Sequence, residues 1–172
     1  MAGLNQGFIE KVIKDMEKLG KPRVLYADYS YIKLVFLWTL FEAWIDTQGQ
    51  FKNAKDGIDH VRENKNNFTK IYPDIGRNAG QGIISSAKAL GIKILPPRKS
   101  KENPNNSSLF YDANDTAEDV IALIYEIRNK IVHGEWQFDW SNDHASEKSA
   151  VYVASDLFEN WIRWANLQGV LR

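Results

Sequence analysis

The strongest constraint on the fold is a long segment, about residues 24–47, that is apolar around much of its helical circumference. Its densest part reads YIKLVFLWTLFEAWI, residues 31–45. A buried strand competes for part of this segment, but the uninterrupted length favours a helix. A helix that is apolar on most sides must be surrounded by other elements. We therefore expect it to lie inside a helical bundle.

Other segments carry apolar residues at helical spacing. The expected helices are residues 8–19, about 56–64, about 78–90, 115–134 and about 145–168. Asp115, with Glu118 three residues later, is expected to cap the fourth of these, and Trp164 is expected to be buried with Trp161 in the last. Residues 92–114 are rich in Pro, Asn, Ser and Lys, which predicts a long exposed loop. The prediction is an all-α, up-and-down bundle of four to five main helices.

Length and composition fit one domain, residues 1–172, because 44% apolar residues suffice for a substantial core. Lys33 and Glu42 interrupt the most apolar run, which is shorter than the roughly 20 residues that span a bilayer. The N-terminal residues lack the pattern of a secretory signal. The absence of cysteine excludes disulfides and thiolate zinc sites. We expect a soluble, cytoplasmic protein that does not bind membranes.

The charge balance bears on nucleic-acid binding. The 22 basic and 22 acidic residues cancel, so the chain lacks the long-range positive field of many nucleic-acid binders. A polyanion would have to be bound by a local basic group. Arg98, Lys99 and Lys101 form such a cluster in the expected loop, and they are either solvated loop residues or an arm that guides RNA phosphates.

The stretch YEIRNKIVHGEW, residues 125–136, places polar residues at the end of an apolar helix. Arg128 is about 40° from Ile124 on a helical wheel, so it flanks the apolar face and needs a partner. Asn129 and His133 share a face, whereas Arg128 and His133 are about 140° apart. A histidine that moves protons and an arginine that holds phosphate suit metal-independent RNA cleavage by a 2′-hydroxyl. The alternative is an ordinary helix end, where the macrodipole favours His and Arg and Gly134 stops the helix.

These residues resemble the signature of the HEPN superfamily (higher eukaryotes and prokaryotes nucleotide-binding domain): Arg, a polar residue that is often Asn, a few intervening residues, then His. The matching residues are Arg128, Asn129 and His133, and LWTLFEAWID resembles the superfamily's early core helix. The resemblance implies a homodimer with two motifs in one cleft. It also implies an endoribonuclease of a toxin–antitoxin, abortive-infection or other defence system, with an antitoxin or another regulatory protein as a partner.

In this interpretation His133 is the general base or acid, Arg128 binds phosphate and stabilises the transition state, and Asn129 orients the reacting groups. Neither a metal nor another cofactor is required. Some superfamily members are not catalytic, so a module that binds a nucleotide, RNA or a protein is the alternative. Glu135 stands where some members carry a tyrosine that a nucleotidyltransferase modifies, so that form of regulation is not expected.

Further residues allow two interpretations. Glu42 shares a stripe with Thr39 and Asp46, and we interpret the stripe as solvated rather than as part of a site. Trp136 and the aromatic residues after it either stack on bases or, as is more common, seal the turn. His60 is expected at the surface and His144 at a helix start. With three scattered histidines and no cysteine, no zinc site is predicted.

Overall fold

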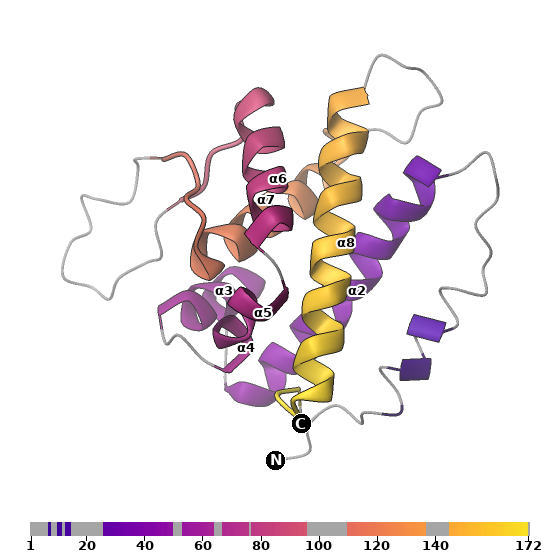
Figure 1. The fold of residues 1–172 in the computed structure, drawn as a ribbon, viewed down its shortest axis with the longest axis vertical. Helices are drawn as coiled ribbons and strands as arrows, with labels where there is room; N and C mark the ends of the chain where they lie inside the picture. The colour runs from indigo at the N-terminus through magenta and orange to yellow at the C-terminus, as the bar shows by residue number, and fades with distance from the viewer. Residues whose placement is uncertain are drawn as a thin grey trace.

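The computed structural model describes residues 26–49, 53–63, 67–75, 77–95, 110–136 and 145–171, and five residues of an earlier helical segment. The helices are α2 (Tyr26–Gln48), α3 (Ala54–Glu63), α4 (Asn67–Lys70), α5 (Tyr72–Ile75), α6 (Arg77–Ala89), α7 (Ala117–Val132) and α8 (Ala145–Leu167) (Figure 1). Apart from one isolated β-bridge, the described residues form no strand. The predicted all-α helical bundle is confirmed.

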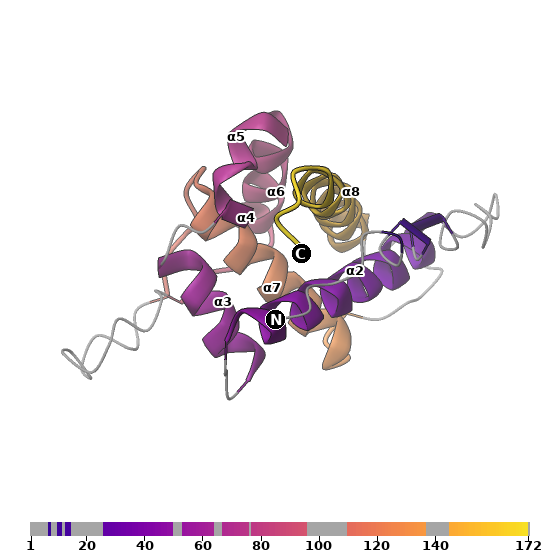
Figure 2. The same ribbon diagram turned by 90° about the horizontal axis from the view of Figure 1, so that it is seen from below.

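The two longest helices, α2 and α8, lie side by side (Figures 1 and 2). Their facing sides are aromatic: Trp38 stacks on Phe158 with ring centroids 5.3 Å apart, and Phe41 meets Phe158 edge-on at 5.6 Å. Helix α7 packs against α2 as well and crosses it at an angle (Figure 2). These two neighbours explain why α2 is apolar around so much of its circumference.

A buried lysine joins α2 to α8. Lys33 forms ion pairs with Asp156 and Glu159, and its Nζ lies 3.0 Å from the Glu159 carboxylate. Burial lowers the pKa of Lys33, but hydrogen bonds to the two carboxylates outweigh burial and leave the pKa raised. Lys33 therefore stays charged inside the interface. Glu159 also pairs with Arg163, four residues later on the same helix, at 2.7 Å.

The short helix α4 depends on α8 for its stability. Its Phe68 ring stacks on Trp161 with centroids 4.9 Å apart, and the Trp161 indole Nε1–H donates to the Phe68 carbonyl over 2.7 Å. A single helical turn is not stable in isolation. Neither α4 nor α5 was predicted from the sequence, because four residues show no periodicity.

Two expectations about helix residues were wrong. The N-cap of α7 is Thr116, not Asp115: the Thr116 backbone is extended and its hydroxyl accepts from the Asp119 backbone N–H over 3.2 Å. The Asp115 carboxylate instead accepts a hydrogen bond from the Tyr72 hydroxyl over 2.9 Å. Trp164, expected in the core with Trp161, is 39% exposed because it lies at the edge of the buried face of α8.

The expected helix at residues 8–19 lies mostly outside the described residues. Gly7, just before this range, is helical, as are Glu10, Lys11, Ile13 and Lys14 within it, and Ile13 is buried. No helix in the described ranges is long and apolar enough to cross a membrane.

The two described ends of the predicted 92–114 loop are joined to each other. Ile94 and Tyr111 exchange two backbone hydrogen bonds of 3.0 Å and form the isolated antiparallel bridge. Residues 96–109 lie outside the described part of the chain.

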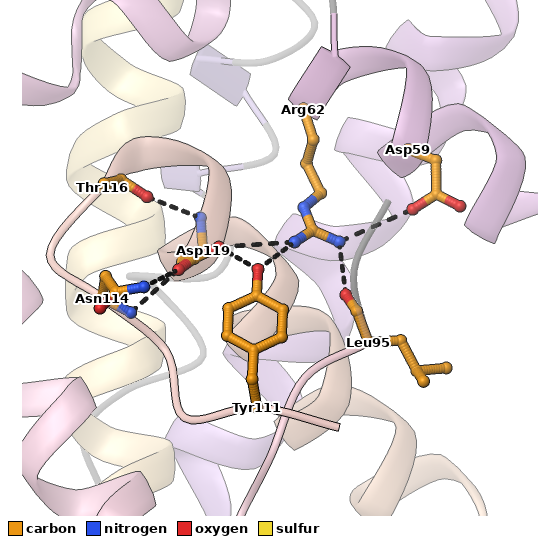
Figure 3. A network of polar contacts seen from close by, with 7 residues as sticks. All are labelled: Asp59, Arg62, Leu95, Tyr111, Asn114, Thr116 and Asp119. Carbon is orange, nitrogen blue, oxygen red and sulfur yellow. Dashed lines mark hydrogen bonds and ion pairs between the residues drawn. The ribbon is translucent and has the colours of Figure 1, made fainter. Parts of the chain in front are cut away.

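A buried polar network holds this bridge against α3 and α7 (Figure 3). Arg62 of α3, with a 2% exposed side chain, donates to the Leu95 carbonyl over 2.9 Å and to the Tyr111 hydroxyl over 3.1 Å. Its guanidinium also lies 3.5 Å from the Asp119 carboxylate and 3.7 Å from that of Asp59. One arginine therefore fixes both described ends of the segment and the start of α7.

Asp119 completes the network. It accepts from the Tyr111 hydroxyl over 2.6 Å, and from the backbone and side-chain nitrogens of Asn114 over 2.9 and 3.0 Å. Burial and the hydrogen bond donated to Asp119 raise the pKa of Tyr111 to about 12. Tyr111 therefore remains a neutral hydrogen-bond donor at physiological pH.

Candidate functional site

The Arg-Asn-His residues lie at the C-terminal end of α7. The helix buries one apolar face, as its spacing predicts, with Val120, Leu123, Ile124, Ile127 and Ile131 directed inward. Arg128 lies on the flank of this face, toward α2, and is partly buried. The structure thus confirms that a guanidinium is present where the helix meets its neighbour.

Arg128 has partners within its own chain. Its Nη1 donates to the Asn129 side-chain oxygen over 3.1 Å, and its Nη2 lies 3.6 Å from the Glu42 carboxylate of α2. The side chains of Arg128 and Glu42 are 21% and 28% exposed. Among the contacts of the described residues, the buried Nε–H of Arg128 has no hydrogen-bond acceptor. The guanidinium is therefore oriented, and part of its donor capacity is unused.

Glu42 corrects the interpretation of the α2 stripe. Thr39 and Asp46 are exposed, as predicted, but the Glu42 carboxylate accepts from the Trp38 indole Nε1–H over 2.8 Å and faces Arg128. Trp38 is itself fully buried. Sequence reasoning missed this contact because Glu42 and Arg128 are far apart in the chain. The available signal was that Glu42 lies among aromatic residues.

His133 ends α7 with its side chain exposed to solvent. It is the C-cap, and its backbone N–H donates to the Asn129 carbonyl over 2.9 Å. Gly134 follows with a φ of 73°, and its N–H donates to the Ile131 carbonyl over 3.1 Å. Such a left-handed glycine is a common helix stop. The end of α7 therefore has the two features predicted from the sequence, a histidine in the last turn and a glycine that stops the helix.

The residues around His133 carry both charges. Lys130 and Glu135 form an ion pair of 2.7 Å across the helix end. The hydrogen bond from Lys130 lowers the pKa of the Glu135 carboxyl, and the charge of the nearby His133 contributes in the same direction. Trp136 is only 7% exposed. It seals the turn rather than offering a surface for stacking, while Phe138 and Trp140 lie outside the described residues.

The structure brings together some of the predicted site residues. Arg128 and Asn129 are in direct contact. His133 follows Arg128 by five residues, about 7.5 Å along the helix axis and about 140° around it, and no hydrogen bond joins their side chains among the described contacts. Arg98, Lys99 and Lys101 lie outside the described part of the chain.

In the described ranges, no group of three or more His, Asp or Glu side chains could hold a metal ion. No protein-family model, curated protein or solved structure matches the chain. An oriented guanidinium with free N–H groups suits an anion, and an exposed imidazole suits proton transfer at neutral pH.

Proposed function

We propose that the chain is a metal-independent endoribonuclease of the HEPN type, with its site at a homodimer cleft, acting in a toxin–antitoxin, abortive-infection or other defence system. The observation that carries the proposal is the oriented guanidinium of Arg128 at the edge of α7, with the exposed His133 ending the same helix. The composite site and the RNA substrate follow from the resemblance of the motif, and the cytoplasmic location follows from the sequence pattern and the absence of cysteine.

The contacts of Arg128 are compatible with phosphate binding. The Glu42 carboxylate lies 2.8 Å from the Trp38 indole nitrogen but 3.6 Å from Arg128 Nη2. The second distance is an ion pair rather than a good hydrogen bond. Glu42 therefore orients the guanidinium while leaving N–H groups for phosphate oxygens. Asn129 accepts from Arg128, so we assign Asn129 to positioning the guanidinium.

In this mechanism the 2′-hydroxyl attacks the adjacent phosphorus, and the 5′-oxygen of the next nucleotide leaves. His133 takes the 2′-hydroxyl proton or delivers a proton to the leaving oxygen. Arg128 stabilises the extra negative charge on the phosphoryl oxygens. The products are a 2′,3′-cyclic phosphate and a 5′-hydroxyl.

In the proposed dimer, a second copy of the chain brings an Arg128 side chain and a His133 side chain together. Because Arg128 and His133 point about 140° apart on one helix, we place Arg128 of one protomer opposite His133 of its partner. Exposed apolar side chains on both helices are available to a partner: Ile32 and Phe36 share a face of α2 and are 45% and 51% exposed, and Val132 beside His133 is 48% exposed.

The test is cleavage of mixed RNA in the presence of a chelator, with the new ends mapped. The parent is expected to leave 2′,3′-cyclic phosphates, and Arg128→Ala and His133→Ala are expected to be inactive while folded and dimeric. His60→Ala and Arg163→Ala are the matched controls on other helices. Parent-like cleavage by the Arg128 and His133 variants would refute the assignment.

Mixing the two inactive variants tests the shared site. Half of randomly mixed dimers contain one copy of each variant, and each mixed dimer has one complete Arg128/His133 site. Activity should therefore recover to about a quarter of the parent value in a two-fold dimer. No recovery from verified mixed dimers would show that each chain works with its own residues.

The alternative function is a non-catalytic helical module that binds a nucleotide, RNA or a protein. The contacts of Arg128 with Glu42 and Asn129 favour it, because a structural arginine needs no substrate to compensate its charge. Absence of cleavage with retained nucleotide or protein binding would support this function.

A further inference from the structure

A second surface of α7, separate from Arg128, contains a pocket. It has a volume of about 340 Å3 and is lined by Gly91, Ile92, Lys93, Phe110, Glu126 and Lys130. Its walls come from α7 on one side and from the two segments joined by the Ile94–Tyr111 bridge on the other. The volume is at the lower end of the range for ligand pockets, about 300–1,000 Å3, which suits a ligand of nucleotide size.

The pocket lies on the same side of α7 as His133. With the 100° helical step, His133 is about 20° from Glu126 around the axis, whereas Arg128 is about 160° away. The separation of seven positions from Glu126 to His133 corresponds to about 10 Å along the helix. An RNA strand that passes His133 could therefore place a neighbouring nucleotide in the pocket.

The buried network described above holds the pocket walls in place. Phe110 directly precedes Tyr111, whose hydroxyl is bonded to both Arg62 and Asp119. Lys93 directly precedes Ile94, which is fully buried and hydrogen-bonded to Tyr111 through its backbone. The positions of both wall residues are therefore fixed by bonds on the far side of the bridge. A pocket with such walls is preorganised for a ligand.

The side chains lining the pocket offer three different interactions. Phe110 is 56% exposed, so its ring is available for stacking. Lys93 is exposed and presents an ammonium, whereas Lys130 is already paired with Glu135. Glu126 is half-buried, and no hydrogen bond to its carboxylate is found in the part of the chain that the structure describes. Burial raises the pKa of Glu126, an effect that the charges of Lys55 and Lys130 oppose. A carboxylate in this position gains from a ligand that donates N–H groups.

We propose that this pocket binds one nucleotide of the RNA substrate and prefers guanine, which stacks on Phe110 and donates its N1–H and N2–H to the Glu126 carboxylate. This inference rests on the proposed function, because it takes RNA as the substrate. A phosphate of the same strand lies within reach of Lys93.

The preference for guanine follows from its hydrogen-bonding edge. Guanine presents two adjacent N–H donors, which match the two oxygens of a carboxylate. Adenine and cytosine present an amino group next to a ring-nitrogen acceptor, and uracil presents one N–H between two carbonyl oxygens. Each of these would direct an acceptor toward Glu126. Stacking on Phe110 adds affinity for any base.

The experiment measures RNA binding by fluorescence anisotropy with the full-length His133→Ala protein, so that the RNA stays intact. The probes are short oligouridylates that carry one central guanosine, inosine or adenosine. We expect the guanosine probe to bind about tenfold more tightly than the adenosine probe, with inosine between them. Glu126→Gln should abolish this preference, and Phe110→Ala should weaken binding of all three probes about tenfold.

Two matched control variants test whether the effects are specific to the pocket residues. Glu63→Gln and Tyr152→Ala change exposed residues of the same kinds on α3 and α8. Introduced into the His133→Ala protein, both should leave binding of the three probes unchanged. Thermal unfolding of each variant verifies that it is folded. Equal binding of the guanosine and adenosine probes, absence of RNA binding, or a preference retained by Glu126→Gln would overturn the inference.

The outcomes separate this inference from the proposed function. If the parent cleaves RNA but the guanosine probe shows no advantage, the nuclease stands and the pocket assignment is wrong. If the guanosine preference depends on Glu126 but no RNA is cleaved, the pocket stands and the nuclease is wrong.

Discussion

Replacing Arg62 by methionine should be among the most destabilising single changes in the described structure. Methionine keeps a long apolar side chain but removes the guanidinium, which is 2% exposed and contacts Leu95, Tyr111, Asp59 and Asp119. The change therefore removes one hydrogen-bond or ion-pair partner from each of these buried groups rather than opening a large cavity.

The magnitude follows from what each partner retains. Removing one member of a buried ion pair costs about 3–5 kcal/mol. Asp119 keeps its hydrogen bonds from Tyr111 and Asn114, and Asp59 keeps Lys55 at 3.6 Å. We therefore expect the lower end, a loss of about 3 kcal/mol. For a chain of this size that corresponds to a melting temperature about 6–12 °C lower.

The measurement is urea unfolding followed by circular dichroism, with the slope of the transition compared between variants. The matched control is Arg163→Met, because Arg163 pairs with Glu159 at 2.7 Å but is 39% exposed. Exposed pairs contribute about 1 kcal/mol or less. The double variant Arg62→Met/Asp119→Asn should lose less stability than the sum of the two single losses, with a coupling of about 0.5–3 kcal/mol. If Arg62→Met costs no more than Arg163→Met, the network is not a determinant of stability.

Three further changes test other parts of the structure. Gly57→Ala would place a Cβ 2.3 Å from Cγ2 of the buried Ile45, so it should cost about 1–3 kcal/mol in denaturant unfolding; Gly82→Ala, with ordinary contacts, should instead stabilise by up to about 1 kcal/mol. Gly134→Ala should cost about 1 kcal/mol, because only the φ of 73° disfavours alanine there. An unchanged melting temperature would show that the left-handed backbone at the end of α7 does not require glycine. Burial raises the pKa of Glu126 against the opposing charges of nearby lysines, so the folded state binds its proton more tightly than the unfolded state. The contribution of Glu126 to stability should therefore fall as pH rises from the unfolded pKa through the folded one. Glu126→Gln should remove that decrease in melting scans between pH 4 and 7, and an identical pH profile for parent and variant would show that the pKa is not raised.

The sequence was most informative where a pattern repeats over many residues. The ends expected for the long helices, residues 24–47 and 145–168, lie within two residues of α2 (Tyr26–Gln48) and α8 (Ala145–Leu167). Gly134 was expected to stop α7 and does so with a positive φ. In each case the signal is local: helical periodicity over many turns, or one residue type that tolerates a left-handed backbone.

The errors arise where a side chain bonds to a remote part of the chain. Asp115 and Thr116 are both suitable N-caps, and the choice between them depends on Tyr72, which binds the Asp115 carboxylate. Similarly, Glu42 was assigned to a solvated stripe because its partner, Arg128, lies on another helix. Helical patterns specify which face a residue occupies, but they do not specify which helix packs there.

The same limit applies to the candidate site. The assignment of Arg128, Asn129 and His133 to a site stays a prediction from the sequence. The structure shows that Arg128 bonds to Asn129, a contact that the sequence had not predicted. The pocket beside Glu126 could not be predicted, because its walls come from three separate segments. Their proximity depends on the Ile94–Tyr111 bridge and on the arginine that supports it.

The bond from the Trp161 indole to the Phe68 carbonyl has a consequence for the order of folding. It joins residues 93 positions apart, and it belongs to α4, a helix of four residues that cannot nucleate alone. Because this bond is absent until the C-terminal α8 docks, we expect α4 to form late in folding. Substitutions within α4 should accordingly speed unfolding while leaving the refolding rate almost unchanged.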